Sequence, residues 1–455
     1  MRLGLLAMSG LRVIDPQLAW LGVTLPQIIA RGHVVASLPS LSLLTIAAFT
    51  PDEVEMEYVE IPHIADLNTR RLPDFDAVAI STYSAQVGEA YALSDDLRRR
   101  GTKVIMGGPH VTALPQEALS HADTVVLGEA EPYWPQVVCD LNVGRLQRVY
   151  GGNGGELYDL KQAPIPRFGL LDPENYNRIP VQTSRGCPHN CEFCAGSRLF
   201  GPGYRQKEVD QVIRELEAVC EIWERPFIEF ADDNLFVDHR WGRDLLERIT
   251  PLGIRWFAET DLSVADDPQL LRSLRPAGCY QLLIGLESLS SENLRAIEST
   301  GWKAARLDQY VDAVRRIQDH GVTVNACFVV GLDADTPGVF DGIRRFIEEA
   351  EPLDIQVTVL TPFPGTALYR RLQGEGRLDR PPFWHKCTLF DVNYRPRGMS
   401  REQLRQGLYD LAVELYSDEA FSRRRRQYMG LIRRLRQREG EARTKLSTSS
   451  DNSRG

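Results

Sequence analysis

The sequence predicts an α/β protein in which an open parallel sheet is followed by a partial barrel of parallel strands and then by a helical C-terminal region. Two observations predict this fold class. Short apolar runs rich in β-branched residues alternate with helical patterns up to residue 141 and again from 181 to 360, and such alternation is typical of βαβ units. A glycine- and proline-rich stretch at 151–166 separates the two series, as expected of a linker.

The first series predicts an open sheet whose ligand lies beyond the carboxyl ends of its strands. The end of each of three strands carries small residues, namely Ser81, the pair Gly107 and Gly108, and Gly128. Small residues allow a ligand to approach the backbone closely, although ordinary tight turns contain them as well. The expected strands are 3–7, 54–61, 77–81, 103–106 and 124–127, and the expected helices are 42–49, 86–100, 115–121 and 133–141.

The second series contains six strand and helix patterns, which predict a partial α/β barrel with its active site at the carboxyl ends of the strands. The expected strands are 181–184, 227–230, 254–257, 280–284, 322–330 and 355–360, and the expected helices are 209–223, 240–249, 268–274, 307–320 and 338–349. Helical patterns at 399–416 and 420–438 follow, the second of them rich in arginine.

Three cysteines, Cys187, Cys191 and Cys194, lie within eight residues. One tight loop can direct their thiolates at a single centre, and three ligands leave one iron of a 4Fe-4S cluster open for chemistry. The alternative is zinc, but a structural zinc site has four protein ligands and usually two separated cysteine pairs. The chain has no second such pair.

This loop resembles the cluster loop of radical S-adenosylmethionine (SAM) enzymes, whose pattern is Cys-x3-Cys-x-aromatic-Cys, with Phe193 at the aromatic position. Residues 54–404 resemble the subgroup that has a cobalamin-binding domain in front of the radical domain, including hopanoid methylases and anaerobic magnesium-protoporphyrin ester cyclases. The resemblance implies that the open iron chelates the methionine part of SAM, and that reductive cleavage of SAM gives a 5'-deoxyadenosyl radical.

The resemblance also implies SAM contacts at the strand ends. Asp232 and Asp233 follow the second barrel strand, where the family binds the ammonium of SAM, and a carboxylate is a suitable acceptor for that group. Both aspartates could instead cap the next helix. Glu287 and Ser288 hold the ribose-binding position, where Glu287 can accept two hydroxyl groups. Ser288 could instead cap the helix that follows.

Two further SAM contacts are implied at the fifth and sixth barrel strands. The fifth strand matches the family's adenine-binding strand in part: Cys327, Val329 and Gly331 hold its first three marked places, and Ala334 replaces the glutamate. Thr361 begins a segment that resembles the one that closes over SAM, although a turn with a helix cap would have the same residues.

In the first domain, the resemblance implies that Ser81, Gly107, Gly108 and Gly128 flank the nucleotide tail of cobalamin. The Asp-x-His-x-x-Gly loop that supplies a cobalt ligand in many cobalamin proteins is missing. His33 and His110 are the nearest candidates, and we expect each to be an ordinary loop or surface histidine. Cobalamin should then bind with its benzimidazole tail displaced into the sheet and with no histidine on its lower face.

The remaining cysteines are interpreted by their local patterns. Cys139, Cys220, Cys279 and Cys327 lie in helical or strand patterns and are expected to be small core residues. Cys387 belongs to an aromatic segment at 381–387. It could line a substrate pocket, but a packing role is favoured.

Composition excludes several classes of protein. The formal net charge is −9 with a pI near 5.6, which argues against a nucleic-acid-binding body. No signal peptide or transmembrane segment is expected, so we predict a cytoplasmic protein whose clustered thiols bind metal. We expect domains at 1–150 (Rossmann-like, cobalamin type), 179–365 (radical SAM barrel) and 366–439 (helical), with a linker at 151–178 and a disordered tail at 440–455.

The sequence thus predicts a cobalamin-dependent radical SAM enzyme with a 4Fe-4S cluster, SAM and cobalamin as cofactors. Methylation of an unactivated carbon of a small-molecule or lipid-like substrate is the favoured reaction. Cyclisation, as in tetrapyrrole metabolism, and a cluster-binding sensor without turnover are the alternatives. The expected partner is a reductant protein such as flavodoxin or ferredoxin. No nucleic acid is expected, and the basic C-terminal helix is more simply a solvated helix than a membrane contact.

Overall fold

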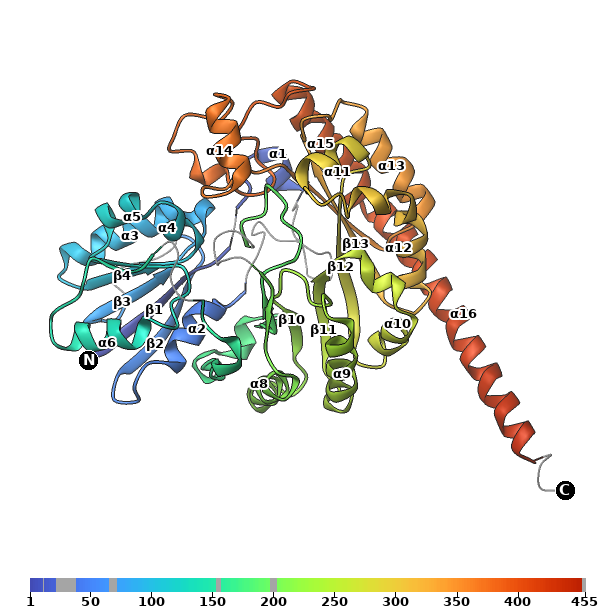
Figure 1. Cartoon of the computed structure of the whole chain (residues 1–455), viewed down its shortest axis with the longest axis horizontal. Helices are drawn as coiled ribbons and strands as arrows, with labels where there is room; N and C mark the ends of the chain where they lie inside the picture. Colours follow the sequence, from blue (N-terminus) through green and yellow to red (C-terminus); the bar gives the residue numbers. More distant parts are fainter. Residues whose placement is uncertain (11, 22–37, 65–71, 153–156, 197–202, 452–455) are drawn as a thin grey trace.

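A computed structural model describes the chain except for residues 11, 22–37, 65–71, 153–156, 197–202 and 452–455. Its N-terminal part is a six-stranded sheet with the order β2-β1-β3-β4-β5-β6, in which all neighbouring strands are parallel (Figure 1). The strands are β1 (Arg2–Met8), β2 (Glu55–Ile61), β3 (Ala77–Ser81), β4 (Lys103–Gly107), β5 (Thr124–Leu127) and β6 (Val149–Gly151).

Helices cover both faces of this sheet because successive side chains of each strand point to opposite faces. Leu6, Ile80 and Met106 pack on the face covered by α3 (Val87–Arg99) and α5 (Pro115–His121). Leu5, Ala79 and Ile105 pack on the other face with α2 (Leu41–Ala48) and α6 (Trp134–Asn142). The short helices α1 (Pro16–Trp20) and α4 (Pro109–Ala113) complete this part.

The second sheet is also parallel, with the order β14-β13-β12-β11-β10-β7, and it curves into the predicted partial barrel (Figure 1). Its strands are β7 (Ile179–Val181), β10 (Phe227–Phe230), β11 (Arg255–Thr260), β12 (Cys279–Glu287), β13 (Thr323–Val330) and β14 (Asp354–Val359). The helices of this part are α8 (Val209–Ile222), α9 (His239–Ile249), α10 (Pro268–Leu274), α11 (Ser291–Ile297), α12 (Tyr310–Gln318) and α13 (Val339–Ala350).

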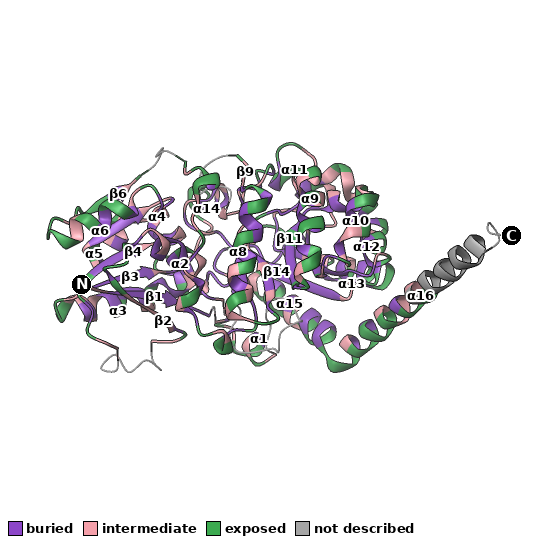
Figure 2. Cartoon of the chain, turned by 90° about the horizontal axis from the view of Figure 1, so that it is seen from below, coloured by how far each residue is buried: buried purple, intermediate pink, exposed green. Residues whose placement is uncertain are grey.

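Side chains that face the helices form one large apolar core, in which Trp256, Ile284 and Phe328 are buried. In Figure 2 the barrel strands are mostly coloured as buried, whereas the helices outside them are buried on part of their surface only. The fold class is therefore the one the sequence predicts.

β6 pairs with β5 and ends at Gly151, the first residue of the expected linker. Three local expectations in the two sheets are wrong. The strand expected at 181–184 is split: β7 ends at Val181, and Ser184–Arg185 forms β8, which pairs with β9 (Arg205–Gln206). Cys139 is exposed, since α6 turns Trp134, Val137 and Val138 inward instead. Cys327, half-buried, lies outside the apolar core that its strand helps to form.

The C-terminal region contains α14 (Ala367–Gly374), α15 (Arg401–Tyr416) and α16 (Asp418–Asp451). Phe383, Trp384 and Cys387 are buried against the α3 and α5 face of the first sheet, so this region packs on both halves of the molecule. Cys387 therefore has the favoured packing role, and burial raises the pKa of its thiol to about 12.

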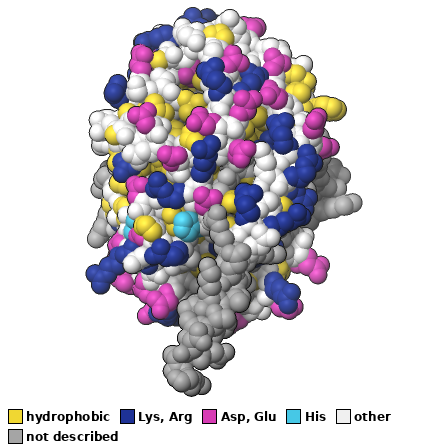
Figure 3. Space-filling view, turned by 90° about the vertical axis from the view of Figure 1, so that its right-hand side faces the viewer, with side chains coloured by type: hydrophobic (Ala, Val, Ile, Leu, Met, Phe, Trp, Pro, Cys, Tyr) yellow, Lys and Arg dark blue, Asp and Glu magenta, His cyan; other side chains and the backbone are white. Residues whose placement is uncertain are grey.

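The tail expected to be disordered from residue 440 is helical as far as Asp451, and α16 projects from the body (Figures 1 and 2). Residues 440–446 contain glutamate, alanine, arginine and lysine, which are good helix formers. On the face that includes this projection, basic and acidic side chains are interspersed (Figure 3). None of the described helices is long and apolar enough to cross a membrane.

Candidate active site

The three motif cysteines lie on the loop that follows β8. Cys191 is buried, and Cys187 and Cys194 are half-buried. The side-chain amide of Asn234 lies 3.9 Å from the Cys187 sulfur. Burial raises the pKa of the Cys187 thiol to about 11 and that of Cys191 to about 12. A metal centre must therefore displace protons from these thiols when it binds.

The cluster loop is attached to the rest of the molecule through Glu192. Its backbone NH donates to the carbonyl of Ile297 (2.9 Å), and its carbonyl accepts from the NH of Leu368 (3.0 Å). Its carboxylate accepts two hydrogen bonds from the Arg371 guanidinium, at 2.6 and 3.0 Å. α14 therefore holds the cluster loop, although it lies outside the barrel.

Within the described residues, no group of three His, Cys, Asp or Glu side chains is close enough to hold one metal ion. The thiols of Cys187, Cys191 and Cys194 are close enough for their charges to affect one another's pKa. In an iron–sulfur cluster each thiolate binds a different iron, so three cysteines can serve one cluster without surrounding a single ion. The donor set therefore fits a cluster.

Asp232 and Asp233 have different environments. Asp232 is buried and accepts hydrogen bonds from the NH groups of Thr183 (2.8 Å) and Ser184 (2.5 Å) and from both of their hydroxyls. Burial raises its pKa to about 6, although these bonds oppose the shift. Asp233 accepts one bond, from the NH of Gly186 (3.1 Å), and lines a cavity. Neither aspartate caps α9, because Asp238 does so.

Sequence reasoning missed a polar chain beneath the cluster loop. His189 Nε2 lies 2.8 Å from Asp261 Oδ2, and Asn234 donates to the same oxygen at 2.8 Å. Burial alone would raise the pKa of Asp261, but hydrogen bonds from His189, Ser263 and Asn234 hold it well below its usual range. The signal was present, because Asn234 and Asp261 both follow predicted strands and His189 lies inside the cysteine motif.

Glu287 ends β12 with a left-handed backbone (φ 66°) and forms an ion pair with the buried Lys303, at 3.0 Å. Lys303 also donates to the carbonyl of Gly285 (2.8 Å). Burial would lower the pKa of Lys303, but Glu287 and the Cys191 sulfur hold it above its usual range. Lys303 therefore belongs to the site, although no sequence pattern singled it out.

The other predicted SAM contacts lie nearby. Ser288 accepts from the NH of Ser290 (3.1 Å), while Ser290 is the N-cap of α11, so Ser288 does not cap the helix directly. Val329 is half-buried on β13. Thr361 is buried and donates to the carbonyl of Val359 (2.9 Å). After β13, the carboxylate of Asp335 accepts hydrogen bonds from the NH groups of Gly331 and Leu332. This turn therefore contains a carboxylate at position 335, although Ala334 replaces the glutamate of the family's adenine-binding pattern.

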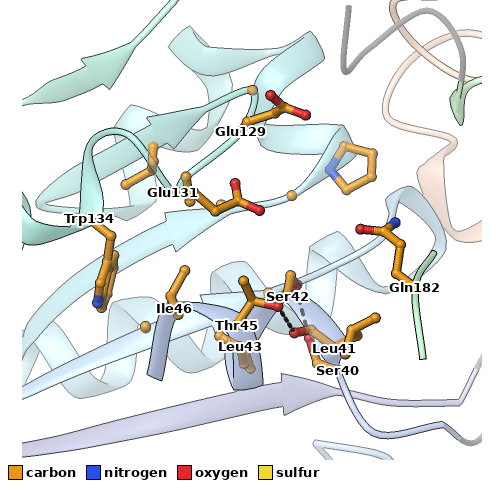
Figure 4. Close-up of a pocket in the computed structure, with 18 of the residues that line it drawn as sticks. Ser40, Leu41, Ser42, Leu43, Thr45, Ile46, Glu129, Glu131, Trp134 and Gln182 are labelled. Carbon is orange, nitrogen blue, oxygen red and sulfur yellow. Dashed lines mark hydrogen bonds between the residues drawn. The ribbon is translucent and has the colours of Figure 1, made fainter. Parts of the chain in front are cut away.

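A cavity of about 410 Å³ lies between the first sheet and the barrel. In Figure 4, α2 residues such as Ser42 and Ile46 lie on one side of it, and Glu129 and Glu131 lie on the other. Ser42 links Ser40 (3.0 Å) to Ser81 (3.2 Å) through hydroxyl contacts. The barrel side is formed by Gln182, Arg185, Gly186, Gly196, Ala231 and Asp233.

All four residues predicted to flank a nucleotide tail, Ser81, Gly107, Gly108 and Gly128, line this cavity. Gly108 has φ 107°, and a Cβ atom there would lie 2.8 Å from the carbonyl oxygen of Thr82. Only glycine fits such a position without strain. Gly128 is also left-handed (φ 73°). At these strand ends a ligand can therefore approach the backbone closely.

His110 is not available to ligate a metal in this cavity. It is fully buried, with Nδ1 3.0 Å from the Ser84 hydroxyl and Nε2 3.2 Å from the Glu117 carboxylate. Since Trp384 donates to the same carboxylate at 3.2 Å, His110 belongs to the packing between α4, α5 and the C-terminal region. It is therefore neither a surface histidine, as expected, nor an available metal ligand. His33 lies outside the described residues.

Arg185 connects the cavity to the cluster loop. It donates to Glu129 at 2.9 Å and to Glu131, both of which follow β5, and it precedes Cys187 by two residues. Arg205 also donates to Glu129, at 2.7 and 3.0 Å. Burial alone would raise the pKa of Glu129, but these two arginines lower it. The two halves of the molecule are thus joined by buried charges next to the site.

Comparisons with known families decide the identity of the two sheets. Residues 28–138 match the B12 binding domain, and residues 181–347 match the radical SAM superfamily. The chain belongs to the radical SAM enzymes that carry a B12-binding domain. These two domains imply a 4Fe-4S cluster, SAM and cobalamin as cofactors, as the sequence predicted. Residues 366–451 match a domain of unknown function.

Several relatives of this radical SAM enzyme are methyltransferases. It is 27% identical to a bacteriochlorophyllide d C-12(1)-methyltransferase of Chlorobaculum tepidum, over 84% of each chain. It is 29% identical to the hopanoid C-2 methylase of Rhodopseudomonas palustris, over 76% of this chain and 66% of that one. The radical SAM methyltransferase TsrM from Kitasatospora setae has the same fold (TM-score 0.65, 16% identity, 82% of this chain and 76% of that chain).

Proposed function

We propose that this radical SAM enzyme methylates an unactivated carbon of a small-molecule or lipid-like substrate. The observation that carries the proposal is the cavity between the two sheets, which is lined both by the glycine-rich strand ends and by Gly186 and Asp233 next to the cluster loop. A methyl carrier and a radical source have to act on one substrate carbon, so their sites must adjoin. The names of the bacteriochlorophyllide and hopanoid relatives support the same reaction.

The cavity fits the nucleotide tail of cobalamin. Apolar residues of α2 and of the strands, such as Ile46 and Val126, form its walls, while serines and three carboxylates supply hydrogen-bonding groups. The backbone at Gly108 leaves no room for a side chain. When bound, the cluster with SAM supplies the radical that removes a hydrogen atom from the substrate, and cobalamin supplies the methyl group.

The chain's own residues hold these groups in place. Cys187, Cys191 and Cys194 are the cluster ligands in this proposal. Asp233, which has one hydrogen bond and faces the cavity, is the acceptor for the SAM ammonium, whereas Asp232 fixes the backbone at Thr183 and Ser184. One carboxylate oxygen of Glu287 accepts a hydrogen bond from Lys303, and the other can accept one from the ribose of SAM. Val329, Ser288 and Thr361 complete the wall for SAM.

The direct test is anaerobic incubation of the reconstituted protein with SAM and a reductant. Dithionite, or a flavodoxin or ferredoxin as the natural reductant class, should release 5'-deoxyadenosine, and Cys191→Ala should release none. SAM carrying a trideuterated methyl group should then transfer that label to a compound in an extract of the source cells. Absence of 5'-deoxyadenosine from folded, cluster-loaded protein would instead support a sensor without turnover.

Cyclisation is the second candidate, because an anaerobic magnesium-protoporphyrin IX monomethyl ester cyclase of Rubrivivax gelatinosus is 22% identical over 72% of this chain and 64% of that one. The same labelling experiment separates the two reactions. Methylation gives a product that is heavier by the labelled methyl group, whereas cyclisation releases 5'-deoxyadenosine without transfer of the label.

The way in which cobalamin binds can be tested separately by spectroscopy. Since the His110 ring nitrogens contact Ser84 and Glu117, we expect that His110 would not ligate the cobalt of bound cobalamin. Bound cob(II)alamin should then show an electron paramagnetic resonance spectrum without nitrogen superhyperfine splitting. A nitrogen triplet would point to His33 or to a retained benzimidazole. Failure of folded protein to retain any cobalamin would remove the methylation proposal.

A further inference from the structure

The inner wall of the barrel contains a group of polar side chains that the SAM and cobalamin sites do not use. Side chains that alternate with the core positions point into the barrel, and among them Glu259 is exposed while Leu283 and Cys327 are half-buried. These side chains would be fully buried if the barrel interior were filled. The barrel therefore keeps a hollow below its strand ends.

The strand register arranges these residues in two layers. Glu259 on β11 lies beside Leu283 on β12, which lies beside Asn325 on β13. In the next layer towards the strand ends, Cys327 on β13 lies beside Gln356 on β14. Both layers are below the ends of β12 and β13, where the proposed SAM contacts Glu287 and Val329 lie.

Three amide side chains on this wall have an oxygen without a hydrogen-bond partner among the described residues, namely those of Gln281, Asn325 and Gln356. The exposed fractions of these residues are 0%, 1% and 9%. An unpaired buried acceptor destabilises a protein by about 1 to 3 kcal/mol, so native structures satisfy such groups. Three of them on adjacent strands indicate that a bound molecule or ordered water donates hydrogen bonds here.

Glu259 also lacks a hydrogen-bond donor in the described part of the chain. The neighbouring carboxylates have partners, since Glu229 pairs with Arg178 and Glu287 pairs with Lys303. Desolvation inside the barrel, together with the charges of Glu229 and Asp233, raises the pKa of Glu259 to about 8, so this carboxyl group holds a proton at neutral pH. A cation beside Glu259 would favour its charged form, and the unpaired amide oxygens favour a hydrogen-bond donor as the occupant.

We propose that Glu259, assisted by Asn325 and Gln356, anchors a hydrogen-bond-donating group of the methyl-accepting substrate, either an ammonium or a hydroxyl. This inference rests on the proposed function, because the substrate carbon must lie near the SAM-binding strand ends. A substrate anchored at these layers occupies the hollow directly below those ends. The substrate class is therefore one with an amine or alcohol at a fixed distance from the methylated carbon, not a pure hydrocarbon.

The test measures binding to the full chain loaded with cluster, cobalamin and S-adenosylhomocysteine, which prevents turnover. Three probes of similar length are titrated by calorimetry: hexylammonium, 1-hexanol and 1-methoxypentane. Hexylammonium and 1-hexanol should bind at least about tenfold more tightly than the ether, which has no donor; this ratio corresponds to about 1.4 kcal/mol. Glu259→Gln should remove most of the preference for the ammonium, and Asn325→Leu should weaken the binding of 1-hexanol.

Glu247→Gln, on the exposed face of α9, is the matched control and should bind all probes like the wild type. Iron content, cobalamin retention and SAM affinity are measured on the same samples, so failure of the proposed function is recognised separately. Equal affinity for the three probes, or an unchanged preference in Glu259→Gln, would overturn the inference. A selective loss of SAM affinity in Glu259→Gln would assign this residue to the SAM site instead. If Glu259→Gln does not fold, Glu259→Asp should reduce the same preference.

Discussion

Arg371 and Glu192 form a two-point ion pair that joins α14 to the cluster loop, with N–O distances of 2.6 and 3.0 Å. The planar guanidinium matches both carboxylate oxygens, and Lys cannot reproduce this geometry. Glu192 follows Cys191 directly, so the pair fixes the position of one proposed cluster ligand. The family model for the barrel ends at residue 347, and this contact comes from beyond it.

Arg371→Lys should lower the iron content of anaerobically reconstituted protein and destabilise the cluster loop by about 1 to 2 kcal/mol, since one of two charge-assisted hydrogen bonds is lost. Iron and sulfide analysis checks this. Arg345→Lys is the control, because Arg345 is exposed on α13. Full iron content in Arg371→Lys would show that the backbone bonds of Glu192 hold the loop alone.

Asp232→Asn and Asp233→Asn should give opposite patterns. Asp232 accepts backbone NH groups at 2.5 and 2.8 Å in a buried position, so its replacement should lower the free energy of unfolding by about 1 to 3 kcal/mol. Asp233→Asn should leave folding nearly unchanged and weaken SAM binding about tenfold or more, through loss of a charge-assisted bond. Denaturant unfolding and calorimetry separate the two effects. The reverse pattern would exchange the roles of the two residues.

Glu287→Gln should weaken SAM binding by about 1 to 3 kcal/mol and leave the iron content unchanged, because it removes a charged acceptor and no cluster ligand. Because Lys303 donates a hydrogen bond to Glu287, this change also leaves Lys303 without its carboxylate partner. The double variant Glu287→Gln with Lys303→Met should therefore recover thermal stability but not SAM affinity. Recovery of SAM affinity in the double variant would mean that the unpaired Lys303, and not a lost ribose contact, causes the defect.

Gly108→Ala should abolish cobalamin retention and lower the free energy of unfolding by about 1 to 3 kcal/mol, since its Cβ would meet the Thr82 carbonyl at 2.8 Å and its φ is 107°. Gly88→Ala is a matched control on α3, where a Cβ has no neighbour within 4 Å. Alanine in a helix is more stable than glycine by up to about 1 kcal/mol, so this variant should be as stable as the wild type or more so. Cobalamin absorbance after gel filtration gives the comparison.

Glu259 should make the stability of the cofactor-free protein depend on pH. The folded protein raises the pKa of Glu259 from its ordinary value of 4.5 to about 8, so between these values the folded state holds a proton that the unfolded chain has lost. Stability therefore falls as pH rises through this window. Glu259→Gln should gain roughly 1 to 2 kcal/mol relative to the wild type between pH 5 and pH 9, allowing for solvent in the barrel. Thermal melting is measured across this pH range, with Glu247→Gln as the control. A melting temperature that depends on pH in the same way for Glu259→Gln and for the wild type would contradict the pKa shift.

Local pattern alone determined the fold class and the cluster loop. Five of the six barrel strands and most of the barrel helices were predicted within a few residues, because period-2 and period-3.6 patterns are properties of neighbouring residues. The three cysteines could be proposed as cluster ligands for the same reason, since their spacing along the chain puts them in one loop. The split of the expected strand at 181–184 was not predictable, because it depends on the pairing of β8 with the distant β9.

Only the tertiary structure decided which polar side chains are available for chemistry. The sequence could not tell Asp232 from Asp233, because the difference lies in the backbone groups of residues 183 and 184, about fifty positions earlier. It could not find Lys303 or Arg371, whose partners Glu287 and Glu192 are remote in the chain. Charge and hydrogen-bond partners are set by distance in space, whereas a sequence pattern records only distance along the chain.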